Sequence, residues 1–269
     1  MKIAVIHNSL NSCGGGERVC LAVIEALKEA GHQVTLATVE PTDWRKVQKI
    51  LGDITRPDEE ISLVKFKVKY FGIYMRQLTF LLVRKLKAEV DLTINTHGDV
   101  LPISADIVYM HFPTFALIER GDIEIPANIK YSRSPFWKFY FVPYRIINKI
   151  NVKLFVKYGL LLTNSKYSRS AIKKHINRNA IVVYPPVDIE NFYYPYGGRE
   201  NIVVSCGRYT PEKNYEFTLK LAEKLNHLKF IIIGASSGKI SSGYYAKLQR
   251  IKRKKGLKNI ELVRDAPFE

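Results

Sequence analysis

The chain has few cysteines and no long uncharged apolar run. Its three cysteines, Cys13, Cys20 and Cys206, show neither the spacing of a metal site nor the pattern of a small disulfide-rich domain. No uncharged apolar stretch approaches the roughly 20 residues that a membrane-spanning helix needs. Met1 leads directly into an apolar run, which leaves no room for a signal peptide. These absences predict a globular protein of a reducing compartment, cytoplasmic and either soluble or peripheral on a membrane.

Acidic residues are missing from one long segment. Residues 125–187 contain no Asp or Glu, in a chain of 269 residues with a formal net charge of +17. Basic and aromatic side chains alternate there in "YSRSPFWKFYFVPYR", which is typical of a surface that contacts anionic lipid headgroups. Phosphate contacts and base stacking on a nucleic acid would suit the same composition, as would a solvated basic face above core aromatics. We expect membrane contact at Trp137, Lys138, Phe139 and Arg145.

The glycines near the N-terminus lack the G-x-G-x-x-G spacing of a dinucleotide site. "NSCGGGERVC" (11–20) instead places Gly14, Gly15 and Gly16 between the strand pattern "KIAVIH" and an amphipathic helix pattern. Bare backbone at that position lets a ligand approach closely, and the helix N-terminus offers N–H groups to an anion. A tight turn that packs the helix on the sheet is the alternative. Glu40, after the next strand pattern, is only weak evidence of a ribose-binding acid.

Strand and helix patterns alternate along the chain and predict an α/β fold with a parallel sheet over residues 1 to about 186. A Pro-, Gly- and Tyr-rich linker follows at 185–201, after which the pattern restarts with "NIVVSCG". We therefore expect two Rossmann-like domains facing a cleft, 1–190 and 191–269. The second domain shows only three strand patterns and is expected to be incomplete.

The second domain opens with its own strand-to-helix turn, "SCGRYTPEKN". Arg208 follows the strand, and Lys213 lies five residues further, near the start of the next helix. A guanidinium and an ammonium group at one such turn suit a diphosphate, and Glu212 could orient Lys213 or cap the helix. The alternative is an ordinary solvent-exposed loop.

Six motifs occur in the order "HNSLNSCGGGERV", "VYMHFP", "TNSKYS", "VVYPPVD", "GRYTPEKN" and "IELVRDAPFE". In this order they resemble the retaining family-4 glycosyltransferases with the GT-B fold. Within that family they are most similar to the α-1,2-mannosyltransferase branch that extends lipid-linked oligosaccharide on the cytoplasmic face of the endoplasmic reticulum. The resemblance implies an acceptor-side domain at 1–190, a nucleotide-sugar donor domain at 191–269, and a hexosyltransferase that retains the anomeric configuration.

The resemblance also implies partners and residue roles. GDP-mannose, or a UDP-sugar such as UDP-glucose, would be the donor substrate, and a lipid-linked glycan at an anionic membrane surface would be the acceptor. No cofactor, metal or nucleic acid is expected. Gly15 and Gly16 would approach the donor, His111 would hydrogen-bond the transferred sugar unless it is a core histidine, and Arg208 and Lys213 would hold the diphosphate. Independently of the resemblance, Ser165 is placed to cap a helix.

Two departures qualify the resemblance. Cys13 stands where this branch often carries another glycine. The glutamate-bearing segment E-x7-E of the family's donor domain is not reached before Glu269. The sequence therefore leaves open a fragment, a donor domain completed by a second chain, or a non-catalytic relic that binds membrane or nucleic acid.

Overall fold

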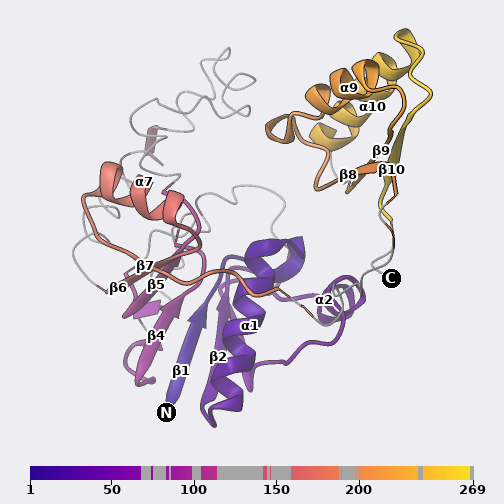
Figure 1. Cartoon of the computed structure of the whole chain (residues 1–269). Coiled ribbons are helices and arrows are strands. Elements are labelled where there is room, and N and C mark those ends of the chain that lie inside the picture. The colour runs from indigo at the N-terminus through magenta and orange to yellow at the C-terminus, as the bar shows by residue number, and fades with distance from the viewer. Residues whose placement is uncertain are drawn as a thin grey trace. The chain divides into compact units, whose positions relative to one another are not determined.

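The computed structural model divides into two compact units, Met1–Asp188 and Ile189–Glu269. Each is described by itself below, and Figure 1 shows the elements of both. The structure describes residues 1–67, 74, 83–84, 86–98, 104–113, 142–143, 146, 159–187, 189, 198, 200–235 and 239–266.

Unit 1 is built on a seven-stranded parallel sheet in the order β3-β2-β1-β4-β5-β6-β7. Its strands are β1 (Lys2–Ile6), β2 (Gln33–Thr38), β3 (Glu59–Ser62), β4 (Leu92–Asn95), β5 (Ile107–Met110), β6 (Leu160–Thr163) and β7 (Ile181–Val182). Its described helical elements are η1 (Leu10–Ser12), α1 (Gly15–Glu29), α2 (Trp44–Leu51) and α7 (Lys166–Ile176).

The central strands of unit 1 read as unbroken apolar runs because both faces of the sheet are covered. Ala4 and Ile6 of β1 pack in one core with Ile172 of α7, whereas Val5 packs in a second core with Ile24 of α1. Alternate residues of one strand thus serve opposite cores. Burying each of these Val or Ile side chains stabilises the fold by about 1.5–3 kcal/mol.

The connections of unit 1 reverse direction around β1. The chain crosses from β1 through α1 to β2 on one side, whereas β4 pairs with β1 on the other side. Such a reversal opens a crevice at the carboxyl ends of the two strands, where ligands bind in open α/β sheets. His7 follows β1 and Thr96 follows β4, so both residues lie at this edge.

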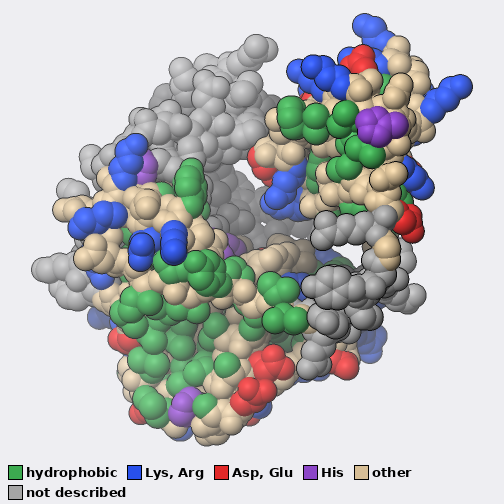
Figure 2. Space-filling view, viewed as in Figure 1, with side chains coloured by type: hydrophobic (Ala, Val, Ile, Leu, Met, Phe, Trp, Pro, Cys, Tyr) green, Lys and Arg blue, Asp and Glu red, His purple; other side chains and the backbone are tan. Residues whose placement is uncertain are grey.

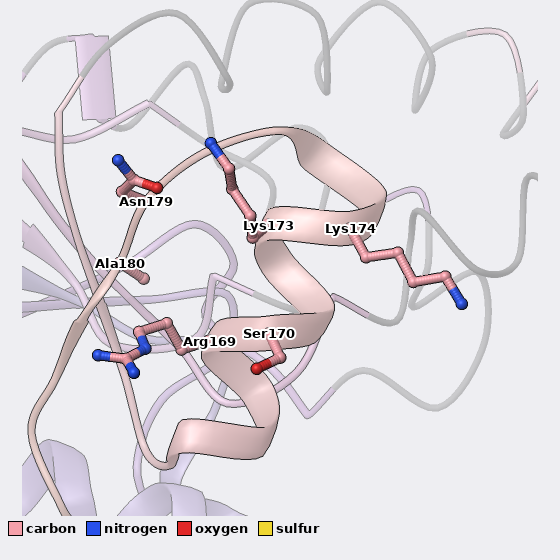
Figure 3. Close-up of a pocket in the computed structure, with 6 residues that line it drawn as sticks. All are labelled: Arg169, Ser170, Lys173, Lys174, Asn179 and Ala180. Carbon is pink, nitrogen blue, oxygen red and sulfur yellow. The ribbon is translucent and has the colours of Figure 1, made fainter.

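Helix α7 begins and ends with clear caps. Ser165 is its N-cap, and its hydroxyl oxygen accepts a hydrogen bond from the Ser168 N–H at 3.1 Å, which confirms the predicted cap. Asn177 ends the helix with a left-handed φ of 57°. The chain then returns beside α7 to β7, which is the edge strand of the sheet, and leaves an open groove (Figure 3). Figure 2 shows Lys and Arg side chains gathered over α7, at the left of the view.

Unit 2 is built on a three-stranded parallel sheet in the order β10-β9-β8. Its elements are β8 (Ile202–Cys206), η2 (Pro211–Lys213), α9 (Tyr215–Lys224), β9 (Lys229–Gly234), α10 (Lys239–Lys254) and β10 (Ile260–Arg264). One face of the sheet, with Phe230 and Ile232, packs in a core with residues of α9 and α10. Val204 lies on the other face and is 57% exposed.

Candidate functional site

The turn between β1 and α1 is a 3-10 helix closed by a left-handed residue. Ser9 caps η1 through its hydroxyl oxygen, which accepts from the Asn11 N–H at 3.2 Å. Cys13 then adopts a φ of 52°, and Gly14 is the N-cap of α1. The helix begins earlier than the sequence suggested, because Gly15 and Gly16 are its first residues. A Cβ on Gly15 would meet no atom within 4 Å, so the helix N-terminus is open on that side.

Glu17 ties this turn to the strand below it. Its Oε2 accepts the Gly14 N–H at 2.7 Å, as the acid of a capping box does. Its Oε1 lies 3.8 Å from Nε2 of the fully buried His7, and Glu17 itself is only 7% exposed. Nδ1 of His7 lies 2.9 Å from the Thr96 hydroxyl oxygen, which donates its own proton to the Ile6 carbonyl at 3.1 Å. The His7 Nδ1 therefore carries a proton.

The surroundings of His7 favour its charged form. Burial alone would lower its pKa, but Cys20 and Glu17 face the ring and together raise the pKa from 6.5 to about 9. Burial likewise tends to raise the pKa of Glu17, and its interactions with His7 and with the backbone of Gly14 outweigh this and lower it. His7 and Glu17 thus form a buried ion pair beneath the glycine turn.

Three histidines line the carboxyl edge of β1, β4 and β5. The His97 ring stacks on His7 with 4.5 Å between ring centroids and meets His111 edge-on at 6.0 Å. A Cβ placed on Gly16 would lie 3.4 Å from Nε2 of His111. The structure therefore brings together Gly16 and His111, which the sequence analysis had placed at one site from separate motifs.

His111 is held as a neutral acceptor. Its burial, and then the positive charge of His7, lower its pKa, although a hydrogen bond to the Thr96 backbone opposes the shift. Its Nε2 is buried and has no hydrogen-bond partner among the described residues, so the Thr96 contact belongs to Nδ1. An unprotonated Nε2 thus lies buried beside the first turn of α1, as a hydrogen-bond acceptor that no described group uses.

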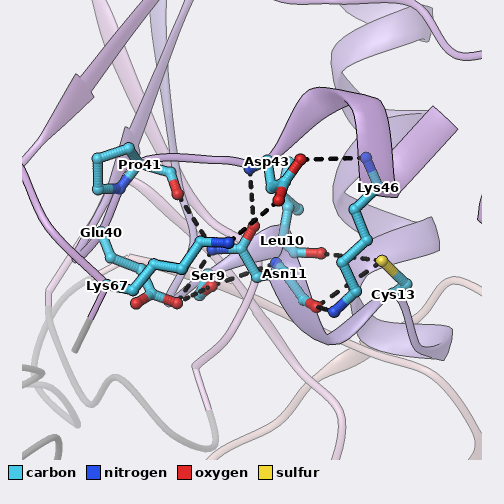
Figure 4. Close-up of polar contacts among 9 residues, drawn as sticks. All are labelled: Ser9, Leu10, Asn11, Cys13, Glu40, Pro41, Asp43, Lys46 and Lys67. Carbon is cyan, nitrogen blue, oxygen red and sulfur yellow. Dashed lines mark hydrogen bonds and ion pairs between the residues drawn. The ribbon is translucent and has the colours of Figure 1, made fainter. Parts of the chain in front are cut away.

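A polar network fixes the outer side of the same turn (Figure 4). Glu40 accepts hydrogen bonds from the Ser9 hydroxyl at 2.8 Å and from the Asn11 amide at 3.1 Å. Asn11 in turn accepts the Asp43 N–H at 2.8 Å. Asp43 caps α2 and pairs with Lys67 at 3.0 Å. Glu40 therefore holds the turn in place, which accounts for an acid at this position without ribose binding.

The corresponding turn of unit 2 depends on two glycines. Gly207 has a φ of 155°, and a Cβ there would lie 3.0 Å from the Tyr215 hydroxyl. A Cβ on Gly234 would lie 2.1 Å from the Gly207 carbonyl oxygen, so neither position admits a side chain without movement. The fully buried Tyr209 places its hydroxyl 2.8 Å from the Ile232 carbonyl and 2.9 Å from that of Val263. This tyrosine locks the turn onto the sheet.

The two predicted cations lie on this second turn and are exposed. Arg208 follows Gly207 directly, and the Lys213 Cε would lie 3.4 Å from a Cβ at Gly207. The Arg208 side chain is 73% exposed, and its Nη2 lies 3.9 Å from the Glu212 carboxylate. An exposed pair at that distance contributes little stability. Both cations are therefore available to an anion at the carboxyl end of β8.

Other predicted features are placed differently or lie outside the description. Trp137, Lys138, Phe139 and Arg145 lie outside the described residues, and their membrane contact stays a prediction. No helix in the described part of the chain is long and apolar enough to cross a membrane. The described His, Cys, Asp and Glu side chains include no group of three arranged to hold a metal ion.

Comparison with known proteins gives a fold and one distant curated relative. No protein-family model matches the chain. "GDP-Man:Man(3)GlcNAc(2)-PP-Dol alpha-1,2-mannosyltransferase" of Dictyostelium discoideum is 23% identical over 265 residues, which cover 82% of this chain and 52% of that protein. The chain thus spans about half the length of the curated relative that it matches.

Two solved structures align with nearly the whole chain. Anabaena Alr3699/HepE, solved in complex with UDP and glucose, has a TM-score of 0.60 and 16% identity and covers 98% of this chain and 69% of its own. WaaG, a glycosyltransferase involved in lipopolysaccharide biosynthesis, has a TM-score of 0.56 and 12% identity and covers 98% of this chain and 70% of its own. At these identities the likeness shows the fold. The predicted α/β class and GT-B fold are confirmed.

Proposed function

We propose that the chain acts as a GT-B glycosyltransferase that moves a hexose from a nucleotide sugar to a lipid-linked glycan, with retention, at the cytoplasmic membrane surface. Mannose from GDP-mannose is the first choice because the curated relative carries those substrates in its name. A UDP-sugar is the second choice, since HepE was solved with UDP and glucose. The order of the six motifs supports the same activity.

The observation that carries this proposal is the approach of His111 to the glycine turn. Its unprotonated Nε2 lies beside Gly16, where added bulk would meet it at 3.4 Å, and Gly15 next to it leaves open space. A hexose hydroxyl can donate to this nitrogen while the free N–H groups of the first turn of α1 face an anionic group. His111 and Gly16 would thus orient the transferred sugar.

In this proposal Arg208 and Lys213 of unit 2 bind the diphosphate of the donor. When the bond between the anomeric carbon and the diphosphate oxygen breaks, negative charge develops on the diphosphate. The acceptor hydroxyl oxygen forms the new glycosidic bond on the same face of the sugar, and its proton passes to the diphosphate. A guanidinium and an ammonium group stabilise that developing charge more than the charge of the bound substrate. We assign these two residues to the diphosphate on the basis of their exposure at the end of β8.

The test measures transfer and binding on the same protein. Labelled mannose from GDP-mannose, or glucose from UDP-glucose, is offered with a polyprenyl-diphosphate-linked glycan, and thermal shifts with GDP and UDP report nucleotide binding. We expect His111→Ala to lower turnover about 100-fold while leaving the nucleotide shift intact, because the contact is with the sugar. Arg208→Ala should remove most of the nucleotide shift. The exposed His227 supplies the matched control, His227→Ala.

Other results would overturn the assignment. If His111→Ala lowers stability and activity together, His111 is a core histidine. If neither nucleotide shifts the wild-type protein and no sugar is transferred, while anionic vesicles or single-stranded DNA still bind, the chain is a non-catalytic binder that kept the fold. The acid-free segment 125–187 is the feature that would favour that outcome.

A further inference from the structure

The groove beside α7 is open and lined by basic and polar side chains. It has a volume of ≈ 520 Å³ and is lined by Arg169, Ser170, Lys173, Lys174, Asn179 and Ala180. Figure 3 shows Lys173 and Asn179 lying toward one another across its upper end, with Arg169 on the same side of the helix, whereas Lys174 points to the opposite side. No acidic side chain is among these lining residues.

The positive charge of this groove is not neutralised from within the described structure. Neither Arg169 nor Lys173 forms an ion pair with a described Asp or Glu, although Lys28, Lys247 and Lys255 each do so elsewhere. The neighbouring sequence supplies no acid either, since residues 125–187 lack them. Arg169 and Lys173 are four residues apart on one helix, so their charges repel each other. A bound anion would turn this repulsion into attraction.

The side chains along the groove include hydrogen-bond donors of the kinds that bind phosphate. The guanidinium of Arg169 offers a planar pair of donors, and the ammonium of Lys173 offers a compact charge. The Asn179 side-chain amide adds an uncharged donor. The Ser170 hydroxyl already donates to the Lys166 carbonyl at 3.0 Å, so we assign it no part in binding.

We propose that this groove binds a phosphate group through Arg169, Lys173 and Asn179. The site is separate from the histidine edge: Ile172 and Ser168 of α7 are buried toward the sheet, where the Ser168 hydroxyl donates to the His111 carbonyl at 2.7 Å. The phosphate belongs either to a lipid headgroup or to a free phosphate or diphosphate. The chain directly after the groove exposes Ile181 by 55% and Tyr184 by 64%, which suits the lipid source.

The test compares two double variants that remove the same pair of side chains, one Arg and one Lys, from two different helices. Arg169→Gln with Lys173→Gln removes the groove pair, whereas Arg250→Gln with Lys254→Gln removes an exposed pair of the same composition and spacing on α10. Sodium pyrophosphate is titrated calorimetrically, and co-sedimentation is measured with vesicles of phosphatidylcholine alone and of phosphatidylcholine mixed with phosphatidylglycerol. We expect the groove variant to weaken binding about tenfold, as the loss of charge-assisted hydrogen bonds should do, and the α10 variant to bind as the wild type does.

The two assays identify the source of the phosphate. If the groove variant loses binding only to the mixed vesicles, the phosphate belongs to a lipid headgroup. If it loses binding only to pyrophosphate, the ligand is a free phosphate or diphosphate. Either result supports the site. Equal behaviour of the two double variants in both assays, or no binding by the wild type, overturns it and leaves an ordinary basic surface. Asn179→Ala changes no charge and should weaken binding a few-fold, whereas Lys174→Gln should change it little. A basic surface without a site predicts the reverse order for these two single variants.

Discussion

The two strand-to-helix turns of this protein share a backbone plan. In unit 1 the chain runs from β1 through η1 to α1, and in unit 2 it runs from β8 through η2 to α9. In each, a residue with left-handed backbone ends the 3-10 helix, Cys13 with a φ of 52° and Asn214 with a φ of 49°. The N–H of Cys13 donates to the Leu10 carbonyl at 3.1 Å, and that of Asn214 donates to the Pro211 carbonyl at 3.0 Å. The turn geometry is thus a property of the repeated unit.

The side chains on the two turns differ in burial and in charge balance. Unit 1 buries His7 against Glu17 under its turn, whereas unit 2 exposes Arg208 and Lys213 on the surface of its own. A buried pair holds its geometry before a ligand arrives but depends on both partners. Exposed cations contribute little to folding. The same turn geometry therefore carries a buried ion pair in unit 1 and two exposed cations in unit 2.

The largest expected effect is the loss of the buried carboxylate. Glu17→Ala leaves a charged His7 without its partner and removes the acceptor for the Gly14 N–H, so unit 1 should lose about 3–5 kcal/mol of unfolding free energy. Both tryptophans, Trp44 and Trp137, belong to unit 1, so tryptophan fluorescence in urea reports this unit alone. Arg208→Ala is the matched change on the turn of unit 2; measured by hydrogen exchange at β9, it should stay within about 0.5 kcal/mol. A loss below about 1 kcal/mol in Glu17→Ala would mean that the pair is not formed in solution.

The pH dependence of unit 1 should be the next largest effect. The pKa of His7 is raised from 6.5 to about 9, so the stability from its charged form is complete below pH 6.5 and is lost as the pH rises through about 9. The decline has an upper limit of about 3 kcal/mol. The lowered pKa of Glu17 adds stability that is present above about 4.5 and is lost as the pH falls through its folded value.

The same urea unfolding, followed by tryptophan fluorescence from pH 6 to 10, measures this decline. In His7→Gln the slope across this range should largely vanish. Unit 2 does not contain His7, so the amides of β9 should keep their hydrogen-exchange protection factors over the same range. An identical decline in both units would point to a cause other than His7.

A third effect contrasts the glycines of the two turns. Gly234→Ala places a Cβ 2.1 Å from the Gly207 carbonyl oxygen, which is backbone and cannot rotate away. We expect unit 2 to lose about 2 kcal/mol, as overpacked sites do. Gly15→Ala meets no atom within 4 Å and should gain up to about 1 kcal/mol in unit 1 from helix propensity. Hydrogen exchange at β9 and tryptophan fluorescence measure the two changes; equal signs would contradict the packing argument.

Local patterns predicted much of this fold. The strand, turn and helix of each unit and the cap at Ser165 follow from apolar periodicity and from short-range capping chemistry. The place of Arg208 and Lys213 on the second turn follows in the same way. Each of these features depends on residues within a few positions of one another in the chain.

The buried chemistry of unit 1 could not be predicted in this way. The contact of His7 with Thr96 joins residues that are 89 positions apart, and it exists because β4 pairs with β1 on the side away from β2. Strand order is a property of the whole sheet, so no local pattern shows which histidines meet. The one available signal was position, since His7 directly follows β1 and His97 lies two residues after the end of β4.

The smallest expected effect concerns the left-handed residue that both turns share. Asn tolerates this backbone region better than Cys does, because its short polar side chain can hydrogen-bond locally. Cys13→Asn should therefore stabilise unit 1 by about 0.5 kcal/mol. The apolar contact that Cys13 makes with the core under α1 is lost in this variant and reduces the gain. Asn214→Cys should destabilise unit 2 by a similar amount. Tryptophan fluorescence in urea measures the first change, and hydrogen exchange at β9 measures the second. Opposite signs of the two stability changes, as expected, would show that Cys13 carries a backbone cost in unit 1 that Asn214 does not carry in unit 2. They would also explain why a glycine suits position 13. Equal signs would show that side-chain contacts at the two turns outweigh the backbone that they share.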